Sequence, residues 1–185
     1  DGSGLRVEAG EKVRVNNSGN NILYAQWKPR TDTRYTVKHW FQNVAGEEYS
    51  QDASLAADET LTGTTGEQTS AQPKQVEGFN AKAVSQETIA ADGTTVVNVY
   101  YDRQVYNVTY RYTNEAPAGA TELPAAQAYR YGDTFTVAPD ATATGYVFSG
   151  WSKEGTVTVA GDVEITGSWS AKDQNLTINW IDETG

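Results

Sequence analysis

One short phrase of alternating bulky and polar residues recurs along this chain at a nearly constant spacing. It reads YTVKHWFQN at 35–43, YNVTYRYTN at 106–114 and, in shortened form, LTINWID at 176–182. The first two copies begin 71 residues apart, and the next begins 70 residues later. Self-similarity at a fixed period is typical of tandem structural repeats. We therefore expect small modules in series, and one folded domain of 185 residues is the alternative.

The module boundaries follow from other markers that keep the same phase. Trp27 and Trp169 precede a copy of the phrase by eight and seven residues, respectively. Short polar segments at 28–34, 102–105 and 170–175 suit the role of linkers. The expected division is 1–32 as the C-terminal part of a truncated repeat, 33–103 and 104–172 as complete modules, and 173–185 as the first strand of a truncated next repeat.

The alternation inside the phrase predicts β-strands. Tyr35, Val37 and Phe41 are spaced by two or four residues, so a strand would place them on one face, packed inward. The 11 Tyr and 5 Trp also favour sheet, because aromatic side chains suit a pleated, half-buried surface. We expect modules that are mainly β, with largely antiparallel strands. At most they contain a little helix, which would place them in the α+β class. A short helix is considered for 48–61.

Composition excludes several classes of function. The net charge is −10, from 14 basic and 24 acidic residues, whereas nucleic-acid binding needs a basic surface. The absence of cysteine excludes disulfides, thiol nucleophiles and thiolate metal sites. No apolar run approaches the roughly 18 residues of a membrane span. We therefore expect that this segment neither binds nucleic acid nor contacts a membrane. Any targeting sequence is expected to lie outside it.

Catalysis has little support in the sequence. His39 is the only histidine, and its place on the Tyr35 face predicts a core residue. With no second histidine and no cysteine, the chain offers no evident acid–base or nucleophilic set. The acidic pairs Glu47-Glu48 and Asp58-Glu59 are interpreted as solvated turn residues rather than as a hydrolytic dyad. We expect no enzyme and no cofactor.

Several of these motifs resemble repeats of Gram-positive cell-wall-anchored proteins. YTVKHWFQN, TLTGTTGEQTSA and TIAADGTTVVNVYY in 33–103 resemble mucin-binding-protein-like and internalin-type B-repeat modules. The segment from YNVTYRYTN to ITGSW is similar to B-repeats and to the SHIRT repeats of streptococcal surface proteins, and NILYAQWKP resembles the closing strand of another B-repeat. Family modules often carry an acidic residue where Lys38 stands, and no functional residue carries over by position.

The resemblance implies a β-grasp-like fold, tandem modules in an elongated rod, and an extracellular location on the bacterial cell surface. The function it implies is a stalk segment that spaces the binding tip of an adhesin from the cell. The alternative is an adhesive module that itself binds mucin-type glycans or host protein. The expected partners are therefore host glycans or extracellular proteins, together with neighbouring repeats of the same chain.

Four residues on the polar strand faces form the predicted ligand-binding site. Trp40 lies opposite the other bulky residues of its strand, and Tyr100 does the same in VVNVYY at 96–101. If the opening and closing strands pair, Trp40 and Tyr100 form an aromatic platform flanked by Lys38 and Asn98. Such a surface can stack on a sugar ring while polar groups hold its hydroxyls. The alternative is a helix or crossover loop that covers this face and makes both aromatic residues core.

Two further hypotheses concern bonds and ions. Lys38 and Asn98 on neighbouring strands could form the Lys–Asn isopeptide bond known from Gram-positive surface proteins, although their faces are expected to be solvated. The turns DGSG at 1–4 and ADGTT at 91–95 carry oxygen ligands, yet they lack the spaced acidic residues of a calcium loop. Asp-Gly is also what a tight hairpin turn requires. We predict no metal site.

Three tryptophans stand at repeat-equivalent or strand-end positions. Trp27, Trp151 and Trp169 are predicted to be core residues that close the ends of the modules.

Overall fold

The chain is mainly β-structure in a computed structural model that describes residues 7, 10–12, 14, 27–173 and 175–178. The described residues form the strands β1 (Thr33–Gln42), β2 (Tyr49–Ser50), β3 (Glu59–Gly63), β4 (Phe79–Ala81), β5 (Val96–Arg103), β6 (Val105–Tyr112), β7 (Gln127–Arg130), β8 (Thr134–Thr136), β9 (Tyr146–Phe148), β10 (Thr156–Thr158), β11 (Val163–Gly167) and β12 (Trp169–Ala171). This confirms the expected mainly β class. None of the described residues belongs to a helix with the length and apolar character that a membrane crossing requires.

The helix considered for 48–61 is wrong. This segment contains β2 and β3, separated by a turn at Asp52. The Asp52 carboxylate accepts hydrogen bonds from the Ser54 backbone N–H at 2.9 Å and from the Ser54 hydroxyl at 2.6 Å. Such local side-chain bonds to the backbone compete with helix formation and favour a turn.

The first sheet contains the strands of 33–103 in the order β2-β1-β5-β4, with β3 also paired to β1. The chain crosses over between β1 and β5, so these central strands run parallel, with Val37 beside Val97 and Phe41 beside Tyr101. The expectation of a largely antiparallel module is therefore wrong for its central pair. One face of this sheet packs inward, and its core includes Tyr35, Val37, Phe41, Val97, Val99 and Tyr101.

The strands of 105–171 form smaller sheets around a second core. β6 lies between β11 and β7, and it runs parallel to β11 just as β1 runs parallel to β5. Two antiparallel pairs, β8 with β10 and β9 with β12, complete this part. The second core is rich in aromatic residues and consists of Val108, Phe135, Ala141, Trp151, Val159, Ile165 and Trp169.

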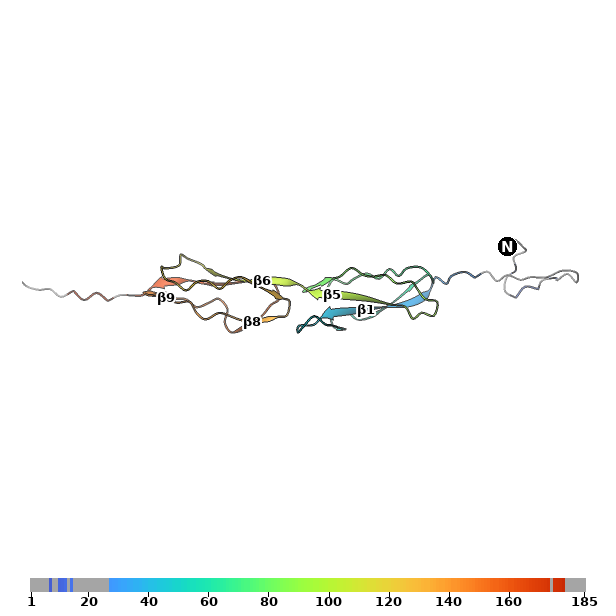
Figure 1. Ribbon diagram of the computed structural model, residues 1–185, viewed down its shortest axis with the longest axis horizontal. Coiled ribbons are helices and arrows are strands. Elements are labelled where there is room, and N and C mark those ends of the chain that lie inside the picture. The colour runs from blue at the N-terminus through green and yellow to red at the C-terminus, as the bar shows by residue number, and fades with distance from the viewer. Residues whose placement is uncertain (1–6, 8–9, 13, 15–26, 174, 179–185) are drawn as a thin grey trace, which may run out of the picture.

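The two groups of strands occupy successive positions along the long axis of the molecule (Figure 1). Their cores are separate clusters with no residue in common. β5 ends at Arg103 and β6 begins at Val105, so Gln104 is the single residue between them.

The tryptophan prediction is confirmed at two of three positions. Trp151 and Trp169 are 8% and 6% exposed, and the Trp151 indole donates to the Pro139 carbonyl at 3.0 Å. Trp27 is 90% exposed, so its prediction as a core residue is wrong. It lies in the extended segment before β1, outside both cores.

Candidate functional site

The structure brings the four predicted site residues together on the outer face of the first sheet. The parallel register places Lys38 beside Asn98 and Trp40 beside Tyr100. The Trp40 and Tyr100 rings are stacked, with centroids 6.3 Å apart and planes inclined by 23°. The Trp40 indole N–H donates to the Asn98 side-chain oxygen at 2.8 Å. We call Lys38, Trp40, Asn98 and Tyr100 the platform.

The platform is open to solvent on the side away from the core. Tyr100 is 39% exposed, Asn98 is exposed, and Lys38 and Trp40 are half-buried. No described residue forms a helix over this face. The covering helix is therefore not found in the described part of the chain, and the covering crossover loop stays a prediction.

A polar group that the sequence did not predict adjoins the platform. The Tyr49 ring meets the Tyr100 ring edge-on at 5.3 Å. The Tyr49 hydroxyl donates to the Asp102 carboxylate and accepts from the Lys82 ammonium at 2.7 Å. The hydrogen bond to Tyr49 and the carboxylate of Asp102, 3.2 Å away, raise the pKa of Lys82 above its ordinary value.

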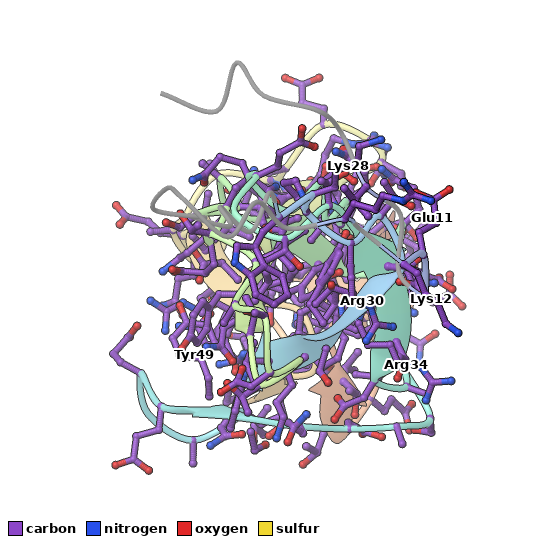
Figure 2. The ribbon with its side chains drawn as sticks, turned by 90° about the vertical axis from the view of Figure 1, so that its right-hand side faces the viewer. Glu11, Lys12, Lys28, Arg30, Arg34 and Tyr49 are labelled. Atoms are coloured by element: carbon purple, nitrogen blue, oxygen red, sulfur yellow. The ribbon has the colours of Figure 1, made fainter. Side chains whose placement is uncertain are left out.

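Tyr49, Lys82 and Asp102 come from three different strands or strand ends, which is why sequence spacing did not reveal them. Asp102 shares the outer face of β5 with Tyr100, and this two-residue spacing was an available signal. Seen along the long axis, Tyr49 lies on the opposite side of the ribbon from Arg30 and Arg34 (Figure 2).

This arrangement is suited to binding rather than to bond making. It offers stacked aromatic faces, an amide, and ammonium and carboxylate groups already paired at the edge. Aromatic faces beside hydrogen-bonding groups can hold a ring that is apolar on its face and polar at its rim, as in a pyranose.

The second group of strands does not repeat the platform. With the 71-residue offset, Lys38 and Trp40 correspond to Thr109 and Arg111. The Arg111 guanidinium makes an exposed two-point ion pair with Glu164, at 3.1 and 2.9 Å. An ordinary solvated ion pair therefore replaces the aromatic stack, which shows that this architecture does not require a stack at that position.

His39 is a core residue, as predicted. It is fully buried, with Nδ1 2.8 Å from the Tyr101 hydroxyl and Nε2 3.1 Å from a Glu59 carboxylate oxygen. The Lys74 backbone N–H donates to the Tyr101 oxygen at 2.8 Å. The Lys74 ammonium, followed by His39, lowers the pKa of Glu59.

The interpretation of the acidic pairs as solvated turn residues is wrong for Glu59, which lies on β3 and is partly buried. Glu59 is bound as described, and the Arg130 guanidinium lowers the pKa of Glu47 through a hydrogen bond of 2.5 Å. The Asp92 carboxylate accepts from the Thr94 backbone and hydroxyl, as a tight turn requires. Within the described residues, no cluster of three or more His, Cys, Asp or Glu could hold a metal ion. The DGSG turn lies outside the described residues.

The isopeptide hypothesis stays a prediction. Lys38 and Asn98 are neighbours in register, but the Asn98 oxygen is engaged by Trp40 and its side chain is exposed. The bond requires a buried pair, and this geometry disfavours it.

Comparisons with known proteins give little further information. No family model and no curated protein matches the chain. A crystal structure of Mub-RV is similar over 76% of this chain and 100% of its own, with 14% identity and a TM-score of 0.26. A likeness at that TM-score does not show a shared fold.

Proposed function

We propose that the chain is a stalk segment of a bacterial cell-wall-anchored surface adhesin, which spaces a binding tip from the cell. In this proposal 33–103 and 104–172 are β-grasp-like modules of an elongated rod, and 1–32 and 173–185 belong to neighbouring repeats. The chain performs no catalysis. The extracellular location rests on the sequence resemblance to Gram-positive surface repeats.

The observation that carries the proposal is the connection between the two cores. Gln104 alone separates β5 from β6, while the cores share no residue. Two small folded bodies with so short a connection make a spacer whose length changes little, because a short linker leaves little freedom of hinge motion. A dispersed negative charge also keeps such a spacer soluble.

Small-angle scattering of the chain tests this proposal. A compact globule of 185 residues has a radius of gyration of about 16 Å. We expect a clearly larger value, together with a distance distribution that has a long tail. A value near that of the compact globule would reject the rod.

The platform favours a second candidate function, glycan binding by the first module. Trp40 and Tyr100 stack on an open face, and the second module has an ion pair at the corresponding place. A mucin-glycan array probed with the wild type and with Tyr100→Ala tests it. Arg111→Ala, on the equivalent strand of the second module, is the matched control. Loss of glycan binding in Tyr100→Ala but not in Arg111→Ala would support glycan binding at the platform. If the wild type binds no glycan, the stalk remains as the proposed function.

A further inference from the structure

We propose that the connection between the two modules is a locked joint, built around Arg103, that holds them in one fixed orientation. The inference rests on the proposed modular organisation and adds to it the element that makes a spacer stiff. Three sets of contacts across the joint carry it, and they join two segments of the first module to residues 130–133 of the second.

The first set is the Arg103 side chain, which is 3% exposed at the end of β5. Its guanidinium donates backward to the Val44 carbonyl at 3.0 Å, within the first module. It donates forward to the Tyr131 carbonyl at 2.9 Å and to the Asp133 carboxylate at 2.5 Å, within the second module. A single planar group therefore ties the β1–β2 loop to the turn between β7 and β8.

The second set surrounds Gln104. Its backbone N–H donates to the Gly78 carbonyl, and its carbonyl accepts from the Tyr131 N–H, both at 2.8 Å. The Tyr131 ring lies edge-on to Phe79 at 5.8 Å. It also covers Gly78 so closely that a Cβ there would lie 2.3 Å from the ring. The linker residue is thus part of a packed and hydrogen-bonded contact on both of its sides.

The third set is a charged pair at the edge of the joint. Arg130 at the end of β7 binds Glu47 of the β1–β2 loop at 2.5 Å, and Gln42 donates to the other Glu47 oxygen at 2.8 Å. Partial burial opposes ionisation of Asp133, but hydrogen bonds from Arg103 and from the Arg130 backbone outweigh it and lower the pKa of Asp133. At neutral pH every charge of this group therefore has an opposite partner.

The first and third sets both join the β1–β2 loop to residues 130–133, and the second joins Gly78 and Phe79 to Gln104 and Tyr131. A bend that moves either of these first-module segments away from residues 130–133 must therefore break at least one set. Breaking the Arg103 contacts would leave a buried guanidinium without its acceptors, which is unfavourable. The Arg103 Nε has no hydrogen-bond partner, so the hydrogen bonds of the two terminal nitrogens alone offset the cost of burying the charge. We therefore expect Arg103 to contribute the largest share of the stiffness.

A distance measurement between spin labels tests the joint. The chain contains no cysteine, so Thr60→Cys on β3 and Thr156→Cys on β10 give one exposed label in each module. We expect one narrow distance distribution in the otherwise wild-type chain. Arg103→Met, which keeps the stem but removes the donors, should broaden it and extend it to shorter distances. Arg111→Met removes an exposed arginine pair of the second module and should leave it unchanged.

Circular dichroism and amide hydrogen exchange in β1 and β6 establish that both modules of each variant are folded. Should Arg103→Met fail to fold, Tyr131→Ala removes the ring contacts of the second set with Phe79 and Gly78 and must broaden the distribution in its place. A broad wild-type distribution, or narrow distributions in both variants with folded modules, would overturn the locked joint. Glycan binding by the chain would count against the stalk while leaving this result intact, so the two failures are distinguishable.

Discussion

Replacement of Trp40 by alanine distinguishes most sharply between two interpretations of this residue, as part of an exposed platform or as part of a covered core. The change removes a stacked contact with Tyr100 and a 2.8 Å hydrogen bond to Asn98. An aromatic pair contributes about 0.5–1.5 kcal/mol beyond its burial. An exposed hydrogen bond contributes near the lower end of about 0.5–1.5 kcal/mol. Together these two interactions contribute about 1–2 kcal/mol. Loss of the covered part of the half-buried Trp40 side chain adds to this, so we expect a loss above that range but below that of a fully buried tryptophan.

Trp151→Ala provides the matched comparison in the other module. Trp151 is 8% exposed and packs against Tyr110, Tyr112 and Phe148, so its removal should cost about 3–5 kcal/mol. Native-state hydrogen exchange reports each module separately, through the buried amides of β5 and of β6. If Trp40→Ala costs as much as Trp151→Ala, Trp40 is a core residue and the exposed platform is refuted.

Two further changes test the joint and the buried polar network. Gly78→Ala should destabilise the chain more than Gly66→Ala in urea denaturation. Both glycines have positive φ, worth about 1–2 kcal/mol, but the added Cβ would strike Tyr131 only at position 78, and equal losses would contradict the contact. Glu59→Gln should lower stability at pH 7 by about 0.5–1 kcal/mol. Since folding lowers the pKa of Glu59 below its ordinary 4.5, its contribution is fully present above that pH and is lost as the pH falls through the lower pKa of the folded state. The difference from wild type should therefore narrow progressively below pH 4.5, and a constant difference would contradict the pairing with Lys74.

The face on which the platform residues lie was predictable because it depends on alternation within a single phrase. Period two fixes which side chains face inward, so Lys38, Trp40, Asn98 and Tyr100 share the outer face, whereas the pairing of Lys38 with Asn98 is known only from the structure. The parallel direction of this pair was not predictable, since alternation is the same in parallel and antiparallel strands. It depends instead on the path of the chain between the strands.

The joint could not be predicted for a different physical reason. Residues 102–105 read as a polar linker, and an arginine there suggests a solvated side chain. Its burial depends on how the two groups of strands meet, because its partners Val44 and Asp133 lie 59 and 30 residues away. Trp27 shows the opposite failure, since a bulky residue at a repeat-equivalent position is exposed in the described structure.

The two full copies of the phrase show how one repeat can combine a fixed fold with a variable surface. Some inward positions keep their residue, as in Val37 and Val108, which are both buried beside the closing strand, whereas His39 corresponds to Tyr110. The outward positions change entirely, from Trp40 in the first copy to Arg111 in the second. Inward residues must fill a core at close packing, whereas outward residues meet water and are free to differ. The aromatic stack on the outward face of the first copy contributes to stability, and ligand contact at the platform is a second role that the Tyr100→Ala experiment tests.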